Sequence, residues 1–419
     1  MKKLFMLLPL AAFMFTACSS DLSEQTLNES PAPNYPEGAI WFTSGIQDVT
    51  RGLTTAANFR AFNVTALHSN HDYAFTNLAV TSTNGTVWTY STGTTDEYKW
   101  WPSDNSDLRF FAYAPTTDDI KNKITINDIS QKMTQFKQAQ KVVNHIDVLA
   151  AAATGNKTNN ALSGMTLDFK HALAQIEIKA KNSKSDEYKV EVLGVKLCRI
   201  NAEGDMTFQT AADDYPTWGN LSTSMDFIKE GAAATAAITL TNSVQSVMFG
   251  TDNFLMLPQQ LTAWTGSNTD ETGAYLSVLC RIWHKVGTEW KIRFPDDQTK
   301  FGFSAIPIGT KLEAGHKYTY TLDFFGAGGG AGQVDPEPTN PEKVLEPGDP
   351  GYDSTNPVNN NQDENVDPNP GLKDDNGDDV ADGDTPGTSV IPEAKSGIRF
   401  TVTITDWING EGDNQVLDL

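Results

Sequence analysis

The residues best suited to metal chemistry lie in one acidic stretch, DDNGDDVADGD, which begins at Asp374. An EF-hand calcium loop places oxygen ligands at alternate positions and requires glycine at the sixth position. Counted from Asp374, Asn376 and Asp378 fit this pattern, but Asp379 occupies the glycine position. Counted from Asp378, Val380 occupies the third position. The pattern favours a solvated acidic tract, so we expect no metal site and no cofactor.

Histidine and serine motifs give no support for catalysis. His68 and His71 are spaced three residues apart near the end of a predicted strand, where their side chains point to opposite faces. The chain contains no HExxH zinc motif and no GxSxG nucleophile motif. His171, within a strand-like run, is interpreted as a hydrogen-bonded structural histidine. We expect no catalytic residues and no enzymatic activity.

Cysteine chemistry is indicated at the N-terminus. A basic MKK is followed by the apolar run LFMLLPLAAFMF, which has the length of a secretory signal and is too short for a transmembrane helix. The sequence FTAC then ends at Cys18 and resembles a bacterial lipobox. In that chemistry the thiol of the first mature residue becomes a thioether to diacylglycerol. Residues 1–17 are therefore predicted to be a lipoprotein signal peptide, and Cys18 to carry an outer-membrane lipid anchor.

The two remaining cysteines, Cys198 and Cys280, both lie in the string LCRI within strand-like runs. An exported protein could pair them as a disulfide. Buried free thiols are the favoured interpretation.

Charge is distributed unevenly along the 419 residues, whose formal net charge is −22. The segment 326–395 contains sixteen Asp or Glu but three Lys or Arg, ten of the twenty prolines, and no Phe, Trp or Met. Such a composition offers little apolar surface to offset the entropy of ordering. We therefore predict a disordered acidic Pro/Gly/Asn/Asp linker. The acidic balance also argues against nucleic-acid binding.

Short alternating strands separated by Asn, Gly, Asp and Pro turns fill residues 39–325. The segment 128–143 is ambiguous between a short helix and an irregular loop. The pattern predicts an all-β protein, most simply two β-sandwiches. Examples of the strand-like runs are AIWFTS (39–44), RAFNVTAL (60–67), LRFFAYAP (108–115), AQIEIKAK (174–181), AYLSVLCRIWH (274–284) and HKYTYTLDFF (316–325).

Tryptophans offer an alternative function. Exposed aromatic rings can stack on sugars, which would suit a monomeric glycan-binding surface lipoprotein. Tryptophan in a β-sandwich is, however, more often part of the core. The candidates are Trp100, Trp101, Trp218, Trp264, Trp283 and Trp290.

Several motifs occur together in a characteristic order. WWPSDNSDLRFFAYAP (100–115) contains a Trp-Pro turn and a strand, and LDFKHALAQIEIKAKN (167–182) contains a Phe-x-His-Ala-Leu element. LMLPQQL (255–261), AGHKYTYTLDF (314–324) and the final ITDWING follow. With the lipobox, this order resembles the fimbrillin family of Bacteroidales surface lipoproteins, which includes FimA-like and Mfa-like major and minor fimbrial subunits.

The resemblance implies two stacked transthyretin-like (Greek-key) β-sandwich domains. It also implies a propeptide that contains the first strand. The expected divisions are 1–17 (signal peptide), 18–51 (propeptide with first strand), 52–165 (N-terminal sandwich), 166–325 (C-terminal sandwich), 326–395 (disordered linker) and 396–419 (C-terminal donor strand segment).

The resemblance further implies a lipid-anchored outer-membrane precursor that an arginine-specific protease cuts before donor-strand exchange. Arg51, in DVTRGLTT, matches the expected cleavage site, and Arg60 is a weaker alternative because it sits within a strand-like run. The implied partners are other fimbrial subunits, in a homo- or hetero-polymer, together with the protease, the membrane lipid and ligands on host or bacterial surfaces. The implied function is a fimbrial subunit that contributes to cell adhesion.

The segment SGIRFTVTITDWING near the C-terminus contains the predicted donor strand. Ile398, Phe400, Val402 and Ile404 alternate with polar residues and should share one apolar face. A lone strand is unstable in water, so this segment must join a sheet. We expect it to dock on its own second domain or stay mobile before cleavage, and to donate in trans afterwards. Charged residues at 400, 402 and 404 should then block assembly and leave the monomer folded.

Overall fold

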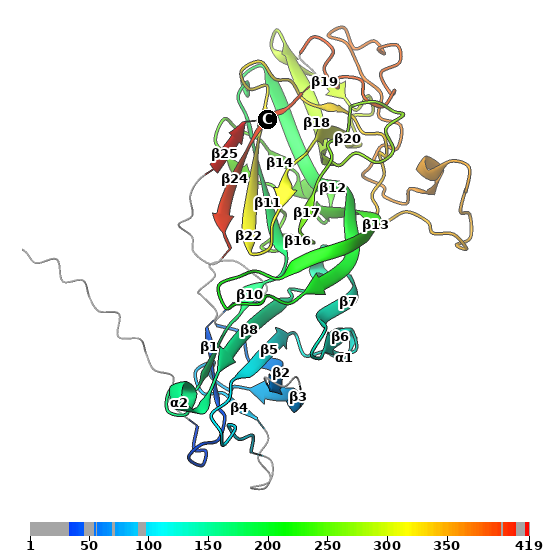
Figure 1. The fold of residues 1–419 in the computed structure, drawn as a ribbon. Coiled ribbons are helices and arrows are strands. Elements are labelled where there is room, and N and C mark those ends of the chain that lie inside the picture. The colour runs from blue at the N-terminus through cyan, green and yellow to red at the C-terminus, as the bar shows by residue number, and fades with distance from the viewer. Residues whose placement is uncertain are drawn as a thin grey trace, which may run out of the picture.

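The computed structural model confirms the all-β class. Its helices α1 (Asp118–Lys121) and α2 (Lys157–Asn160) are single turns. The strands form two stacked units, an N-terminal sandwich and a C-terminal sandwich, which lie end to end (Figure 1). The residues that the structure describes are 33–45, 54–55, 57–68, 72–90, 98–394 and 397–407, with the backbone pairing of 415–418.

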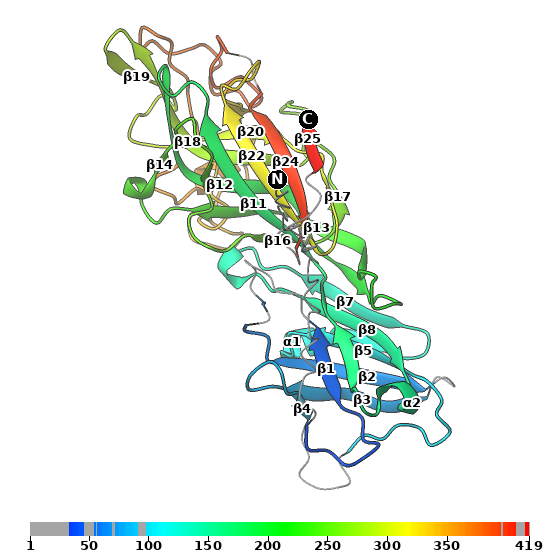
Figure 2. The same ribbon diagram turned by 90° about the vertical axis from the view of Figure 1, so that its left-hand side faces the viewer.

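The N-terminal sandwich is built on a six-stranded sheet in the order β10-β8-β5-β2-β3-β4. A two-stranded parallel sheet, β1 with β9, lies across one face of it (Figure 2). The strand bounds are β1 Phe42–Gly45, β2 Ala61–His68, β3 Tyr73–Thr81, β4 Thr89–Tyr90, β5 Leu108–Ala114, β8 Leu149–Gly155, β9 Met165–Asp168 and β10 Lys170–His171.

The C-terminal sandwich consists of two larger sheets. One has the order β15-β11-β22-β24-β25, and the other runs β23-β20-β18-β12-β7-β6 with β13, β14 and β19 attached. The first sheet's bounds are β11 Ala174–Asn182, β15 Gln245–Ser246, β16 Phe254–Met256, β22 His316–Phe324, β24 Arg399–Asp406 and β25 Gln415–Asp418. The second sheet's bounds are β6 Ile124–Ile126, β7 Gln131–Lys137, β12 Tyr188–Thr207, β13 Thr217–Glu230, β14 Ile238–Thr239, β18 Tyr275–Val286, β19 Glu289–Phe294, β20 Gly302–Pro307 and β23 Gln333–Val334. The small pair β17 (Gln259–Gln260) and β21 (Lys311–Leu312) lies beside them.

Both faces of the N-terminal sheet are covered. In β5, Phe110 belongs to the core under β1, whereas Phe111 and Tyr113 belong to a second core that also contains residues of the C-terminal sandwich. The second core includes Phe136 of β7 and Met206 of β12. Because β7 pairs with β12, a hairpin from the first half of the chain extends the second unit's sheet. This shared core and sheet join the two sandwiches.

The division between the sandwiches lies later than residue 165. Strand β9 pairs with β1, and β10 pairs with β8, so the N-terminal sandwich keeps the chain as far as His171. The C-terminal sandwich begins with β11 at Ala174. The sequence TLDFKHAL, predicted to open the second domain, therefore closes the first.

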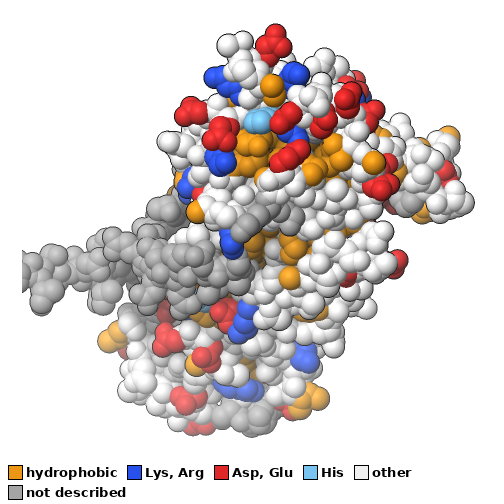
Figure 3. All heavy atoms as spheres, turned by 90° about the horizontal axis from the view of Figure 1, so that it is seen from above, with side chains coloured by type: hydrophobic (Ala, Val, Ile, Leu, Met, Phe, Trp, Pro, Cys, Tyr) orange, Lys and Arg blue, Asp and Glu red, His pale blue; other side chains and the backbone are white. Residues whose placement is uncertain are grey.

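The prediction of a disordered linker is wrong for residues 326–394, which we call the acidic strap. The strap packs on the second sheet of the C-terminal sandwich and buries its few apolar side chains. Val366 joins a cluster with Phe301 and Phe303, and Ile391 lies in the main core. Basic residues of the sandwich bind the strap's acidic groups and carbonyl oxygens, which compensates for its small apolar surface. Acidic and basic side chains are correspondingly interspersed on the end of the molecule seen in Figure 3.

Cys198 and Cys280 are free and buried, as favoured from the sequence. Among the described residues, no helix is long and apolar enough to cross a membrane.

Candidate assembly site

Strand β1 lies in an apolar groove of the N-terminal sandwich, and its backbone pairs with one described strand, β9. Ile40 and Phe42 are 0% and 1% exposed. The ring of Phe42 lies 6.0 Å from the ring centroids of both Phe62 and Phe110. The hydroxyl of Tyr90 donates to the carbonyl of Ile40 at 2.7 Å. Ile40 lies two residues before β1, where the backbone also bridges Trp100, and its N–H donates to the carbonyl of Lys99 at 2.7 Å. The groove is therefore filled by side chains of β1 and of the residues directly before it, and β1 itself pairs with β9.

Trp41, directly before β1, holds the start of this strand through a hydrogen bond and a close contact. Its indole N–H donates to the carbonyl of Ala161 at 3.2 Å. Gly164 has a φ of +77°, and a Cβ at this position would lie 2.7 Å from the ring of Trp41. Glycine is required here by both the backbone conformation and the close approach. Burial of Ile40 and Phe42 contributes about 3–6 kcal/mol to holding β1.

The candidate cleavage residues lie on the segment that follows β1. The strand ends at Gly45 and the described chain resumes at Thr54. Arg51, like the lipidation candidate Cys18, lies outside the described residues. Arg60 is half-buried directly before β2, and its guanidinium donates to the carbonyls of Phe59 and Ala57 at 2.6 Å. Arg60 is thus engaged with its own backbone.

Strand β24 is an interior strand of the C-terminal sandwich. It pairs with β22 along its whole length and with β25 on its other side. Ile398, Phe400 and Val402 are 4%, 7% and 0% exposed and belong to the main core, whereas Ile404 is partly buried. The predicted alternation is confirmed, and the strand is docked on its own second domain. Burial of the three side chains contributes about 5–9 kcal/mol.

The end of β24 meets the N-terminal sandwich through a buried histidine. The ring of His171 stacks on that of Trp407, with centroids 3.9 Å apart. Its Nδ1 lies 2.9 Å from a carboxylate oxygen of Asp147, and the other oxygen of Asp147 accepts the N–H of Thr54 at 3.0 Å. We call Asp147, His171 and Trp407 the junction triad. The triad connects Thr54, which lies shortly after Arg51, to the end of β24 through the side chains of Asp147 and His171.

The family model for fimbrillin-like proteins matches residues 50–335. The chain belongs to the fimbrillin-like family. No curated protein sequence matches the chain. The matched range ends where the acidic strap leaves β23, so this fimbrillin-like chain carries the rest of the strap and β24 outside the matched region.

Solved structures of similar proteins include several from Bacteroides. A fimbrial protein from Bacteroides vulgatus is 16% identical, with a TM-score of 0.42, over 68% of this chain and 94% of that chain. A proposed cell adhesion protein from Bacteroides uniformis is 17% identical, with a TM-score of 0.39, over 70% of this chain and 94% of that chain. A second proposed adhesion protein, from Bacteroides ovatus, is 15% identical, with a TM-score of 0.40, over 69% and 93%.

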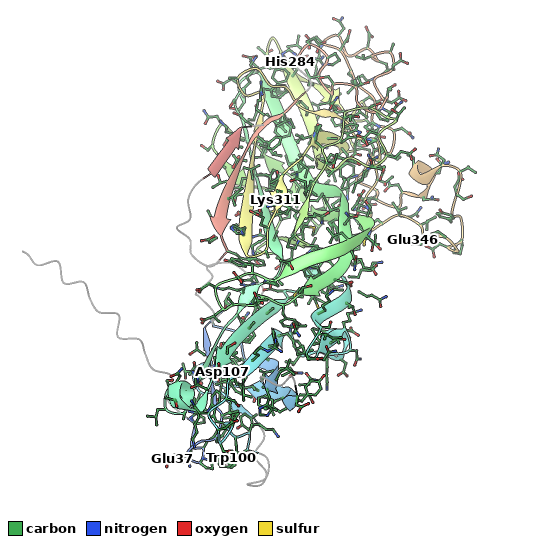
Figure 4. The ribbon with its side chains drawn as sticks, in the orientation of Figure 1. Glu37, Trp100, Asp107, His284, Lys311 and Glu346 are labelled. Carbon is green, nitrogen blue, oxygen red and sulfur yellow. The ribbon has the colours of Figure 1, made fainter. Side chains whose placement is uncertain are left out.

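The candidate sugar-stacking tryptophans of this fimbrillin-like chain do not form one platform. Trp101 and Trp264 are buried, and the indole N–H of Trp218 donates to the carbonyl of Ala172 at 2.6 Å. Trp100, half exposed, lies at the lower end of the molecule in Figure 4. Trp290 lies on β19 at the opposite end (Figure 1), where it pairs with Lys285 of β18, whereas Trp283 pairs with Ile292. The rings are too dispersed for a continuous stacking surface.

His171 is a structural histidine, as predicted, because it is buried in the junction triad. A second buried histidine, His145, was not singled out in the sequence. Burial lowers the pKa of His145 to about 3, and its Nδ1 accepts the backbone N–H of Leu255 at 3.1 Å. Among the described residues, no group of three or more His, Cys, Asp or Glu side chains is arranged to hold a metal ion.

Proposed function

We propose that this chain is a fimbrial subunit that is anchored through lipid on Cys18, is cut after Arg51, and polymerises by donor-strand exchange for cell adhesion. Cleavage after Arg51 separates β1 from the rest of the sandwich. The observation that carries the proposal is the position of β1: a detachable strand fills an apolar groove, and the candidate cleavage residue follows it by six residues. Loss of β1 would expose Phe62 and Phe110 and the free edge of β9.

The C-terminal strand is the proposed donor. Its alternating apolar residues resemble the pattern that β-strand addition requires, with alternate side chains entering the groove of the acceptor. Leaving the C-terminal sandwich would cost the burial of Ile398, Phe400 and Val402. Entry into a neighbour's groove would return burial of the same kind, so the exchange is close to balanced. The open groove left by β1 supplies the driving force.

The expectation that charges at 400, 402 and 404 leave the monomer folded is wrong for two of the positions. Phe400 and Val402 belong to the core of their own sandwich. A charge there would destabilise the subunit as well as assembly, since an unpaired buried charge is strongly unfavourable. A test of the donor strand must therefore leave the docked strand intact.

An engineered disulfide, which can be reduced, meets this requirement. Thr319 of β22 and Thr403 of β24 face each other in register, and both are partly exposed. Cysteines at both positions should form a disulfide that holds β24 on its own subunit. After cleavage the oxidised variant should stay monomeric, and reduction should restore SDS-resistant ladders. Ladders of equal intensity from the oxidised protein would exclude β24 as the donor.

Cleavage is tested with the same ladder assay. A lipid-free precursor treated with an arginine-specific protease should polymerise, whereas Arg51→Ala should not. Arg60→Ala is the matched control and should polymerise as the unaltered chain does. If Arg51→Ala is cut and assembles normally, Arg51 is not the maturation site.

A further inference from the structure

A buried lysine and a buried aspartate lie together where the acidic strap leaves strand β23. Lys196 of β12 and Asp335, directly after β23, are both 0% exposed. The Nζ atom of Lys196 lies 3.1 Å from Oδ2 of Asp335. The residues are 139 positions apart in the chain, yet strand pairing fixes both, because Val334 pairs with Ser304 and Lys196 with Ser277.

The two oxygens of Asp335 have different environments. Oδ1 accepts the hydroxyl of Tyr275 at 2.9 Å and the backbone N–H of Glu337 at 2.7 Å. Oδ2 is buried without a hydrogen-bond partner among the described residues, although it lies close to the amine. Two preformed donors on one oxygen are the arrangement that stabilises a tetrahedral oxyanion in acyl transfer.

The amine is held beside the carboxyl group by the strap. Nζ of Lys196 donates to the backbone carbonyls of Glu337 and Thr339 at 2.6 and 3.3 Å. The ring of Phe303 lies below it, with its centroid 4.3 Å away. The side chain thus has little freedom to leave, and the reacting atoms are held in proximity, which can replace a large part of the barrier to a bimolecular reaction.

A third group can carry protons. Lys196 pairs with Ile228 of β13, so Asp226 is its diagonal neighbour on the same face of the sheet. Burial raises the pKa of Asp226 to about 6, and the positive charge of Lys196 opposes that rise. Burial disfavours the charge on Lys196, but Asp335 and its acidic neighbours outweigh burial and raise the pKa of the ammonium. The ammonium must therefore pass its proton to a carboxylate before it can react.

We propose that Lys196 and Asp335 form an intramolecular amide bond. Proton transfer within the ion pair converts the ammonium and carboxylate into an amine and a carboxylic acid. The lone pair of Nζ attacks Cγ of Asp335, and negative charge develops on Oδ1, where Tyr275 and the Glu337 N–H stabilise it. Asp226 accepts a proton from nitrogen and returns it to Oδ2, which leaves as water. One C–N bond forms, one C–O bond breaks, and no oxidant is required.

The bond would fasten the strap covalently to the sheet. Lys196 lies in the middle of β12, and Asp335 directly follows β23, where the strap leaves its strand pairing with β20. A cross-link here would make the strap around Asp335 resistant to unfolding and to proteolysis. The proposed bond is independent of how subunits assemble.

The test is the mass of the folded, secreted chain after denaturation. The expected mass is that of the processed sequence less one water molecule. Protease digestion should give a branched peptide that contains both Lys196 and Asp335, identified by tandem mass spectrometry. A full sequence mass, with both peptides recovered as linear species, would overturn the proposal and leave an ordinary buried ion pair. This result needs no variant and so does not depend on a variant's ability to fold.

Variants then test the chemistry. Lys196→Arg keeps the charge but should restore the missing water to the mass. Asp335→Asn should give the same branched peptide as the unaltered chain, by loss of ammonia in place of water. Asp226→Ala should slow or abolish the cross-link in protein that remains folded by circular dichroism. An unchanged rate in Asp226→Ala would remove Asp226 from the mechanism, and a cross-link that persists in Lys196→Arg would show that another pair is joined.

Discussion

Arg293 should decide whether the acidic strap is part of the folded C-terminal sandwich. Its side chain is 1% exposed, and its guanidinium binds three groups of the strap. It contacts Asp375 at 2.5 Å and Glu393 at 2.6 Å, and its Nε donates to the carbonyl of Lys373 at 2.5 Å. Replacement by alanine removes all three contacts, which together span the final third of the strap.

The magnitude follows from the exposure of the partners. Breaking a fully buried ion pair costs about 3–5 kcal/mol. Here the carboxylates of Asp375 and Glu393 have side chains that are 48% and 54% exposed, so water can solvate them after the change. With that discount for solvent screening, we expect Arg293→Ala to lower the free energy of unfolding by about 2–4 kcal/mol. The midpoint of thermal unfolding should fall by roughly 4–15 °C.

Thermal unfolding and amide hydrogen exchange measure the two expected effects. Exchange should accelerate at strap amides bonded to the sandwich, such as that of Lys373, which donates to the carbonyl of Arg293 at 3.0 Å. Lys311→Ala is the matched control, because Lys311 pairs with Glu313 at 2.6 Å on the exposed surface and should change stability by less than about 0.5 kcal/mol. Equal stability of Arg293→Ala and the control, with unchanged exchange in the strap, would show that the strap does not depend on this clamp.

Three further predictions concern other parts of the chain. Gly164→Ala should destabilise the docking of β1 by about 1–3 kcal/mol and speed proteolysis of the chain after β1, because Gly164 has a positive φ and an added Cβ would clash with the ring of Trp41. Gly219→Ala is the control, because a Cβ there meets nothing within 4 Å. Equal proteolysis rates in the two variants would refute the argument. Burial lowers the pKa of His145 to about 3, so as pH falls below about 6.5 the unfolded chain binds a proton at His145 that the folded chain does not bind, and the folded state should lose up to about 1.4 kcal/mol of stability per pH unit between those values. In urea unfolding, the stability of His145→Gln should fall less steeply with pH over that window. An equally steep fall in stability for the variant and the unaltered chain would contradict this. Cys18→Ala should abolish acyl labelling and membrane fractionation, and undiminished labelling would exclude Cys18 as the lipid site.

The alternation of apolar and polar residues predicted a strand correctly where one of its faces is exposed to solvent and the other is buried. It predicted β24 correctly, with Ile398, Phe400 and Val402 inward. It could not assign a buried face to β5, since both faces are buried, one in each core. The expectation of a short helix or an irregular loop over 128–143 is wrong, because Gln131–Lys137 form strand β7. The pattern was misleading because Gln135 has a φ of +54°, which interrupts the alternation between Met133 and Phe136.

The acidic strap was mispredicted because the amino-acid composition of a segment shows how many apolar residues it contains but not which residues elsewhere in the chain bind it. Two of the cations that hold the strap, Lys196 and Arg293, lie in β12 and β19, and nothing in their sequence context points to residues 335–393. Its backbone is also satisfied locally by Asp and Asn side chains, as at Asp353, which accepts the N–H of Thr355 at 2.8 Å. Turn chemistry of this kind can order a polar segment once a few anchors fix its path.

The junction triad could not be predicted either, because its members are brought together only by the fold, yet it has a consequence for assembly. If the chain is cut after Arg51, Gly52 becomes the new N-terminus and carries an ammonium group. Thr54, two residues on, donates its N–H to Asp147 at 3.0 Å, and two residues span at most roughly 7 Å, so the ammonium would be tethered near that carboxylate. A new cation near Asp147 would compete with His171 for the carboxylate, and His171 is the residue on which Trp407 stacks. We infer that cleavage loosens the end of β24 at the same time as it frees the groove of β1, which would couple the release of the donor strand to the opening of the acceptor site.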